Sequence, residues 1–284
     1  MYRLLSCMLA IVTSAVALLP LSVSASDELL LGVHPYKSAT ALQKTFSPLA
    51  EYLSRVTGHR VRIVIAKDYQ QHIAQIGENK LDIAFLGPVS YVRLVDRYGP
   101  KPILARLEIN GSPTFQGHII SRVMGPIHTI EDIKGKTFAF GDPESTMSHL
   151  VPRYMLWKAG IGADDLARFD FLGNHVNVAL AVLSGKYDAG AVKEAVFHQY
   201  ESRGLRSVAT TPKLSEHLFV TRANMPQEKL ERLREAMFSL HTQADEMKTL
   251  HAIKKTMTRL VPAKDSDYDN LRLILNELAS IGVK

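Results

Sequence analysis

Short apolar runs alternate with amphipathic segments along the chain from Leu29 onward. The runs are rich in Leu, Val and Ile, and the segments between them repeat apolar residues at the spacing of a helix face. This alternation indicates an α/β fold with parallel strands. In the first unit, the predicted strands are LLLGV (29–33), VRIVIA (61–66) and LDIAFLG (81–87), and the predicted helices are 39–55, 70–78 and 89–98.

The same alternation resumes at Lys136 and predicts a second α/β unit. Its predicted strands are KTFAFGD (136–142), RFDFLG (168–173) and YDAGAV (187–192), and its predicted helices contain YMLWKAG (154–160) and VNVALAVLSG (176–185). The units also resemble each other locally, because IGENKLDIAFLGPVSY and VLSGKYDAGAVKEAVF both run from a helix end through Lys and Asp into a short strand. Asp82 and Asp188 hold matching places in these segments, so we interpret both as structural.

Two β-rich segments, GHIISRV (117–123) and SEHLFVTR (215–222), are expected to join the units as a hinge. After Pro226 the apolar positions recur at helical spacing, and we expect these helices to pack on the first lobe. The predicted architecture is a two-lobed α/β protein, in which each lobe is a mixed, mostly parallel sheet flanked by helices. The predicted boundaries are 1–25 for a signal peptide, 26–120 for the first part of lobe 1, 121–216 for lobe 2 and 217–284 for the return to lobe 1.

The first residues, MYRLLSCMLAIVTSAVALLPLSVSA, are typical of a secretory signal peptide. They contain an early Arg, an apolar middle and small residues before an expected cleavage after Ala25. A membrane anchor is the alternative, and Pro20 and the serines within the run argue against it. Cleavage would leave a mature chain that begins at Ser26 and lacks Cys7, the single cysteine, so disulfide and thiol chemistry are excluded.

The net charge and a search for known motifs do not point to a specific function. The formal net charge is +6 at pH 7, and loss of Arg3 would leave +5, an excess that suits an anionic ligand but is common on soluble proteins. No basic run is dense enough to indicate nucleic acid binding. The eleven histidines form neither an HExxH motif nor a cluster with metal-ligand spacing, and no GxSxG or Walker sequence occurs. We therefore expect no metal and no cofactor.

Three tyrosines follow three successive predicted strands of the first lobe. Because ligands bind beyond the carboxyl ends of parallel strands, Tyr36, Tyr69 and Tyr91 are candidate ligand-binding residues. Any one of these tyrosines, taken alone, is more typical of a residue packed at a sheet edge with its hydroxyl in water than of a ligand contact. Together, their phenols would donate hydrogen bonds to an oxyanion while their rings wall the site.

In the second lobe, the stretch FGDPESTMSH follows a predicted strand and offers hydroxyls and backbone amides. Ser145 or Thr146 can cap the next helix, and Pro152 indicates that regular helix begins no earlier than Ser148. Residues 144–147 would then form a turn with free amides, which is an anion-binding arrangement. An ordinary capped helix start without a ligand is the alternative.

Two further residues of the second lobe lie at helix starts. His175 would present a donor to the same anion, although a lone histidine is more often structural. Glu194 follows the YDAGAV strand, where a carboxylate would suit a ligand that carries a proton or an ammonium group; a solvated surface residue is the alternative. His149 beside the Ser-Thr run makes a nucleophile and base pair conceivable, but no specific catalytic motif accompanies it.

Nearly the whole chain after the signal peptide resembles one known family. LGVHPYKS, FSPLAEYLSRVTGHRVRIVIAKDYQQHI, LDIAFLGPVSYV, TIEDIKGKTFAFGDPEST and FLGNHVNVALAVLSGKYDAGAV, in this order, are similar to the phosphonate, phosphite and phosphate periplasmic binding proteins that serve ABC transporters. The resemblance implies a type II periplasmic-binding-protein fold that closes around one ligand. It also implies that the three tyrosines face the cleft from the first lobe, while Ser145, Thr146 and His175 hold the phosphorus-bound oxygens.

One departure from the family concerns ligand identity. The family usually has Ser-Thr-Ser-Gly where this chain has Ser145, Thr146, Met147 and Ser148. Ser148 would restore the lost donor, whereas Met147 would shrink the site or favour an apolar substituent. The pattern also places no Arg or Lys in the inferred contact shell, so neutral amides and hydroxyls would carry recognition.

Three functional hypotheses follow. The leading one is a periplasmic receptor that captures a small phosphorus oxyanion and delivers it to an ABC permease. The second is a sensing protein of the same fold that signals to a membrane sensor kinase. The third is an enzyme that uses His149 or His175, which turnover of a bound ligand would reveal.

Overall fold

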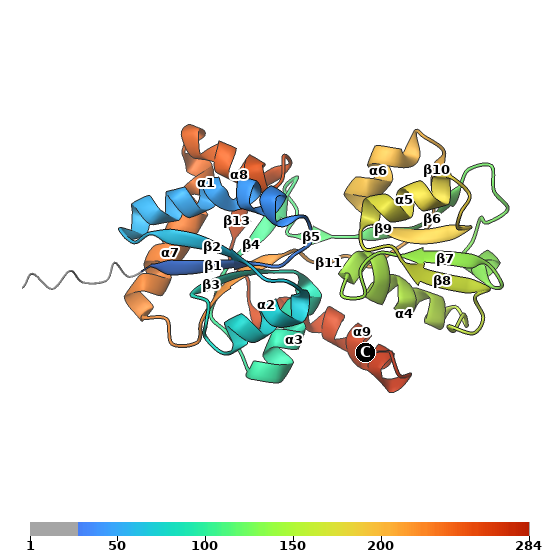
Figure 1. The fold of residues 1–284 in the computed structure, drawn as a ribbon, viewed down its shortest axis with the longest axis horizontal. Helices are drawn as coiled ribbons and strands as arrows, with labels where there is room; N and C mark the ends of the chain where they lie inside the picture. Colours follow the sequence, from blue (N-terminus) through green and yellow to red (C-terminus); the bar gives the residue numbers. More distant parts are fainter. Residues whose placement is uncertain (1–27, 284) are drawn as a thin grey trace, which may run out of the picture.

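The computed structural model describes residues 28–283, and the predicted signal peptide lies outside them. Two sheets, each with helices packed against it, form two lobes that a two-stranded ribbon joins (Figure 1). The predicted α/β fold with mixed sheets is therefore confirmed. Among residues 28–283, no helix combines the length and apolar character that crossing a membrane requires.

The first lobe contains a six-stranded sheet with the order β13-β4-β12-β3-β1-β2. Strand β1 pairs in parallel with β2 and β3, and the other neighbours pair antiparallel. The strands are β1 (Leu29–Val33), β2 (Val61–Ile65), β3 (Ile83–Leu86), β4 (Ile103–Ile109), β12 (Leu218–Thr221) and β13 (Met257–Val261); the helices are α1 (Ala39–Thr57), α2 (Tyr69–Gly77), α3 (Pro88–Tyr98), α7 (Gln227–Ser239), α8 (Met247–Ile253) and α9 (Asp269–Ser280).

The second lobe contains a five-stranded sheet with the order β10-β6-β9-β7-β8. Strand β7 pairs in parallel with β8 and β9, and β6 pairs antiparallel with β9 and β10. The strands are β6 (Gly117–Arg122), β7 (Thr137–Phe140), β8 (Arg168–Phe171), β9 (Ala189–Lys193) and β10 (Leu205–Thr210); the helices are α4 (Val151–Lys158), α5 (His175–Leu183) and α6 (Glu194–Glu201).

Asp82 and Asp188 have equivalent structural roles in the two lobes. Each carboxylate accepts a hydrogen bond from a backbone amide of the neighbouring parallel strand: Asp82 from Leu30 at 2.8 Å and Asp188 from Thr137 at 3.0 Å. Asp82 also accepts from Arg222 at 2.9 Å. Because both aspartates fix the start of a parallel pair, the local similarity between the two sequence segments reflects the same β-sheet contact made twice.

The connection between the lobes differs from the prediction at both crossings, because residues 218–221 of the segment SEHLFVTR form β12 inside the first sheet. Thr114–Phe115 (β5) and Leu214–Ser215 (β11) form the antiparallel ribbon. The segment GHIISRV was expected to be a crossing, but its strand β6 lies inside the second sheet, between β9 and β10. Its run of buried apolar residues is explained by this central position, since an exposed linker would not bury them.

The C-terminal helices divide between the lobes. Helices α7 and α8 pack with α1 over the first sheet, as predicted. Helix α9 lies against α3 and also against α4 of the second lobe, where Glu277 accepts from Tyr154 at 3.3 Å and pairs with Lys158 at 3.4 Å (Figure 1). Helix α9 therefore packs on the first lobe, as predicted, and its apolar face also contacts the second lobe.

Candidate ligand-binding cleft

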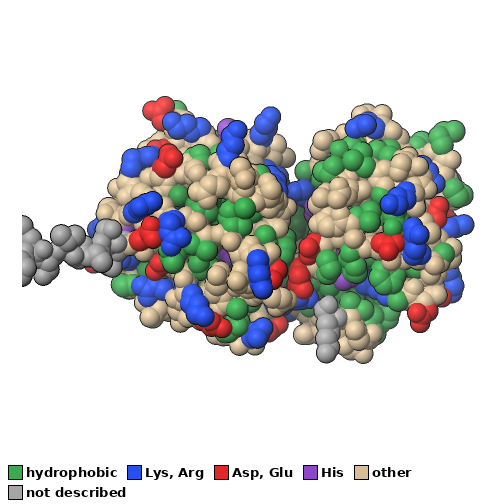
Figure 2. Space-filling model, viewed as in Figure 1, with side chains coloured by type: hydrophobic (Ala, Val, Ile, Leu, Met, Phe, Trp, Pro, Cys, Tyr) green, Lys and Arg blue, Asp and Glu red, His purple; other side chains and the backbone are tan. Residues whose placement is uncertain are grey.

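The carboxyl ends of the parallel strands in the two lobes face each other across a cleft. A groove separates the lobes in the space-filling view, and acidic and basic side chains gather along it (Figure 2). Glu144, after β7, accepts from Gln70 at 3.4 Å and forms an ion pair with Arg93 of α3. These contacts cross the cleft and hold the two strand ends opposite each other.

Aromatic rings form the first-lobe wall of the cleft. The His34 ring, just after β1, lies 4.9 Å from the Tyr36 ring and 5.2 Å from the Tyr69 ring, and stacks on His217 at 5.7 Å. Burial raises the pKa of Tyr36 to about 12. Burial, together with the charge of Asp142, also raises the pKa of Tyr69. Both phenols are therefore protonated at neutral pH and can donate hydrogen bonds.

Two histidines, His34 of this wall and the fully buried His72, share one acceptor. His34 Nδ1 lies 3.1 Å and His72 Nε2 lies 3.0 Å from the carbonyl oxygen of Phe85, so both nitrogens donate to it. Burial lowers the pKa of His72 to about 4. Burial, with the charges of His217 and His72, holds the pKa of His34 well below its usual value. The side chains of His34, Tyr36 and Tyr69 are thus uncharged at neutral pH.

Tyr91 does not join the rings of Tyr36 and Tyr69. It lies one turn inside α3, is fully buried, and donates its hydroxyl hydrogen to Asp265 at 2.7 Å. Its ring packs on Tyr268 with a centroid distance of 4.7 Å. The expectation that three phenols converge therefore holds for Tyr36 and Tyr69 only, because the helix directs the third toward the C-terminal segment.

The turn after β7 supplies free backbone amides to the second-lobe wall. The Glu144 amide donates to the Asp142 carboxylate at 2.7 Å, and the Ser145 amide donates to the Asp142 carbonyl at 2.9 Å. Within residues 28–283, the amides of Thr146 and Met147 have no acceptor. A π-helical turn, Thr146–Leu150, precedes α4, so regular helix begins after Ser148, as predicted.

The hydroxyls of this turn have different surroundings. Ser145 is the N-cap and accepts from the Ser148 amide at 3.1 Å. The Thr146 side chain is largely buried, and its hydroxyl makes no hydrogen bond to other described residues. Ser148 is fully buried and donates to the Ala191 carbonyl, so it does not restore a donor to the cleft. The Ser148 side chain fits only because residue 141 is a glycine: a Cβ at Gly141 would lie 2.5 Å from the Ser148 hydroxyl oxygen.

Met147 points away from the turn toward the ribbon between the lobes. Its side chain is 1% exposed, and its sulfur accepts from the Thr211 hydroxyl at 3.4 Å. A Cβ at Gly117 would lie only 3.0 Å from the Met147 Cβ, so this side chain also requires a glycine at the start of β6. Met147 therefore contributes its amide to the turn and its thioether to packing at the hinge.

His175, the first residue of α5, has a defined tautomer. The Lys193 amide donates to its Nδ1 at 3.0 Å, so the ring hydrogen of the neutral side chain is on Nε2. Burial, with the charges of Lys193 and His217, lowers the pKa of His175 to about 3. The imidazole is therefore neutral at pH 7 and holds one N–H for donation.

Cationic and acidic residues that were not predicted to contact the ligand lie beside the cleft. Burial lowers the pKa of Lys193, and the charges of Lys254 and Lys37 lower it further. Glu216 is buried and lies 3.5 Å from Lys254 and 2.8 Å from His217 Nδ1. Burial opposes its ionisation, but these partners lower the pKa of Glu216 to about 2, so it stays ionised.

Two other candidates lie outside this arrangement of donors. The Glu194 carboxylate lies close to His118 and His198, and it also lines a hollow of about 250 Å³ with Glu216 and Lys254. His149 Nδ1 donates to the Pro143 carbonyl at 2.7 Å, and its ring packs edge-on against Phe140 and Phe171. No hydroxyl among the described residues is hydrogen-bonded to His149, so the geometry provides no nucleophile and base pair there.

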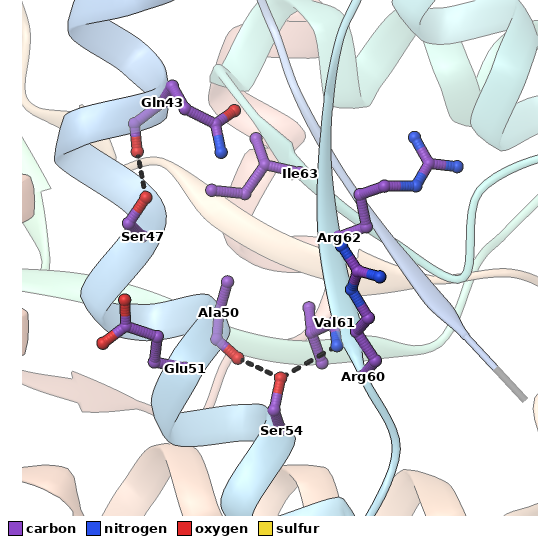
Figure 3. A pocket seen from close by; sticks show the side chains of 9 residues that line it. All are labelled: Gln43, Ser47, Ala50, Glu51, Ser54, Arg60, Val61, Arg62 and Ile63. Carbon is purple, nitrogen blue, oxygen red and sulfur yellow. Dashed lines mark hydrogen bonds between the residues drawn. The ribbon is translucent and has the colours of Figure 1, made fainter. Parts of the chain in front are cut away.

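A shallow hollow of about 310 Å³ lies on the opposite flank of the first lobe, between α1 and the edge strand β2 (Figure 3). Its serines already use their hydroxyls: Ser47 donates to Gln43, and Ser54 donates to Ala50 and accepts from Val61. It has no aromatic wall and no free amides, so the cleft between the lobes is the better candidate site.

Comparison with known proteins agrees with this architecture. Residues 31–268 match the family described as "ABC transporter, phosphonate, periplasmic substrate-binding protein". The chain is 26% identical over 310 residues to the "Phosphate-import protein PhnD" of Mycolicibacterium smegmatis, covering 96% of each. It is 32% identical over 162 residues to the "Phosphonates-binding periplasmic protein" of Escherichia coli, covering 55% of this chain and 48% of that relative.

Solved structures share the fold. PhnD1 from Prochlorococcus marinus, in complex with methylphosphonate, has a TM-score of 0.78 at 21% identity and covers 89% of this chain and 98% of that one. A binding protein component of an ABC phosphonate transporter from Pseudomonas aeruginosa has a TM-score of 0.76 at 24% identity, covering 90% and 89%. Because the family match spans most of the sequence and the cleft lies between two such lobes, this chain belongs to the periplasmic substrate-binding proteins of phosphonate ABC transporters.

Proposed function

We propose that this protein captures a small phosphorus oxyanion between its lobes and delivers it to an ABC permease. Phosphonate, phosphite and phosphate are the candidate ligands. The relatives support this class, because one is named for phosphate import and another for phosphonates. Family membership supports a transport role over sensing.

The anion would bind at the turn that begins with Ser145. The observation that carries this proposal is the pair of free amides at Thr146 and Met147, accompanied by His175 with its hydrogen held on Nε2. The Thr146 hydroxyl adds another donor. Backbone amides at the start of a helix stabilise an anion through both hydrogen bonds and the helix dipole.

The opposite wall and the nearby lysines would complete the site. Tyr36 and Tyr69 would donate from the first lobe when the cleft closes, which excludes water and strengthens each hydrogen bond. Lys37, Lys193 and Lys254 would attract the anion without forming a bidentate pair with it. Met147 would affect ligand choice only indirectly, through packing at the hinge.

A thermal-shift panel tests the ligand class. Phosphate, phosphite, methylphosphonate, aminoethylphosphonate and an alkanesulfonate would each be added at equal ionic strength to protein freed of bound ligand by unfolding and refolding. Ligand at 100 times its Kd adds about 2.7 kcal/mol to the free energy of unfolding, which raises the melting temperature by several degrees. We expect the shift with a phosphorus anion; a shift with the sulfonate alone would contradict the proposal.

Thr146→Val tests the binding turn. The substitution keeps the shape of the side chain and removes its free hydroxyl, so we expect calorimetry to show affinity reduced about tenfold, since a hydrogen bond to a charged group contributes about 1.5–3 kcal/mol. Thr256→Val, at an exposed position of the first lobe, is the matched control and should bind as the wild type does. Equal affinity in both variants would argue against the turn.

Export and delivery need separate tests. We propose cleavage after Ala25, so mass spectrometry of the exported protein should show a chain that begins at Ser26. Deleting the gene should abolish uptake of the radiolabelled anion at low concentration. Uptake that persists while a transcriptional response to the anion is lost would instead support the sensing alternative.

A further inference from the structure

Three potential metal ligands meet on the α6 side of the second sheet, outside the proposed anion site. They are His118 of β6 and Glu194 and His198 of α6, and their ligand atoms all lie within 4.8 Å of one another. Glu194 and His198 are four positions apart on one helix, so their side chains share a face. That face lies over β6, because α6 packs on it.

His118 has a nitrogen that the protein leaves without a partner. The residue is only 6% exposed, and its Nε2 is buried without a hydrogen bond among the described residues. Its Nδ1 lies 2.8 Å from the Ser207 hydroxyl, which is itself 3.5 Å from the Ala209 carbonyl. If Ser207 donates to Ala209, it accepts the Nδ1 hydrogen of His118, and the Nε2 lone pair stays free. An unpaired buried polar atom costs about 1–3 kcal/mol, and a bound cation would remove that cost.

The other histidine is oriented by a carboxylate. His198 Nδ1 lies 3.2 Å from the Glu201 carboxylate, which leaves Nε2 available. A histidine that ligates a metal commonly donates its second ring hydrogen to such a carboxylate. The His198 side chain is 59% exposed, so an ion can reach the cluster from solvent.

We propose that His118, Glu194 and His198 bind a divalent first-row transition ion, with Zn²⁺ as the best match. Two imidazoles and one carboxylate are a common ligand set for Zn²⁺, with water at the fourth position. Ligand bonds of about 2.0–2.2 Å in a tetrahedral site require ligand atoms about 3.4 Å apart. Small rotations of the His198 and Glu194 side chains would be needed to bring ligand atoms that lie within 4.8 Å of one another to that separation.

The proposed ion would join two elements beside the hinge. Glu194 follows β9 directly, and its amide donates to the Gln116 carbonyl at 3.1 Å, immediately before β6. His118 is the second residue of β6. Binding would therefore fix the start of α6 to the strand that enters from the inter-lobe ribbon. None of its three ligands belongs to the proposed anion site, although Glu194 directly follows Lys193, whose amide donates to His175.

Calorimetric titration with ZnCl₂ tests the proposal. The full chain, carrying no histidine tag and pretreated with a chelator, should bind one ion. We expect His198→Ala to weaken the interaction at least tenfold, and this exposed substitution should leave the melting temperature of the metal-free protein unchanged. Glu194→Gln should also weaken binding, and Co²⁺ should give the absorption bands of a tetrahedral site that His118→Ala removes.

Two matched variants locate the ion. His251→Ala, at an exposed position on α8 of the first lobe, and Thr146→Val, in the anion-binding turn, should both bind Zn²⁺ as the wild type does. Absence of stoichiometric binding by the wild type would overturn the proposal. Wild-type affinity in both His198→Ala and Glu194→Gln would overturn it as well, even if Zn²⁺ bound elsewhere.

Discussion

The two walls of the cleft are built on similar sheets but offer different chemistry. In each lobe one strand, β1 or β7, pairs in parallel with a neighbour on both sides. The first-lobe wall consists of side-chain rings from Tyr36, Tyr69 and His34. The second-lobe wall consists mainly of backbone amides at the turn after β7, with His175 beside them.

Because of this difference, we expect the two lobes to contribute unequally to the binding free energy of the anion. Amides held by a turn are fixed before the ligand arrives, so they bind without losing conformational freedom. We propose that the phenols of the first lobe complete the site when the lobes close on the ligand. We therefore expect the second lobe to hold the anion and the first lobe to cover it.

Acid should disrupt both walls and have the largest effect on stability. The pKa is lowered to about 4 for His72 and for His149 and to about 3 for His175, chiefly by burial. Below pH 6.5 these histidines become protonated in the unfolded chain but stay neutral in the folded protein. The free energy of unfolding therefore falls as the pH falls toward 4. The melting temperature measured from pH 7 to pH 4 should decline steadily. A constant value down to pH 4.5 would contradict the neutral state of these rings.

His175→Ala should cause the largest loss of affinity among single substitutions in the walls. It removes a donor to the anion and leaves the Lys193 amide without its acceptor. A hydrogen bond to a charged group contributes about 1.5–3 kcal/mol, which is roughly a tenfold to hundredfold change in Kd. Calorimetry at pH 7.5 measures it. His175→Gln, which retains an acceptor and a donor, should recover part of the loss.

Tyr69→Phe should weaken binding by a smaller factor, about tenfold, since it removes one hydrogen bond to the anion and, unlike His175→Ala, leaves no protein group without its partner. The ring would still fill its place beside His34. Because the phenol acts on the closed state, stopped-flow measurements should place most of the change in the dissociation rate. A loss confined to the association rate would contradict a covering role.

Tyr91→Phe should leave the affinity for the anion unchanged, because Tyr91 lies outside the first-lobe wall. Its hydroxyl is bound to Asp265, so its removal should lower only the free energy of unfolding, by about 1 kcal/mol. Thermal melts and calorimetry on the same sample separate the two effects. Weaker ligand binding with an unchanged melting temperature would show that Tyr91 contributes to ligand binding.

The sequence predicted the features that depend on local order. Ser145 was expected as a possible cap, and the alternating runs indicated which strands carry site residues at their ends. Tyr91 was misplaced because strand order alone does not show which way the following helix turns its face. Met147 and Ser148 were treated as cleft residues, although one packs at the hinge and the other bonds to β9.

Residues brought together from distant segments were not predicted. Lys254 follows α8, and Glu216 and His217 lie between β11 and β12, yet all belong to the charged group beside the cleft. Their convergence depends on the return of the chain to the first lobe, which no local pattern encodes. The same holds for His118, which meets α6 only because β6 lies within the second sheet.

The most direct test of the central claim compares the two walls in one experiment. The phosphorus anion that shifts the melting temperature would be titrated into the wild type, His175→Ala and Tyr69→Phe under identical conditions, with Tyr91→Phe as the reference. A greater loss of affinity in His175→Ala than in Tyr69→Phe is the predicted result, because the second lobe holds the anion. An equal or greater loss in Tyr69→Phe would contradict the account and assign the binding energy to the first lobe.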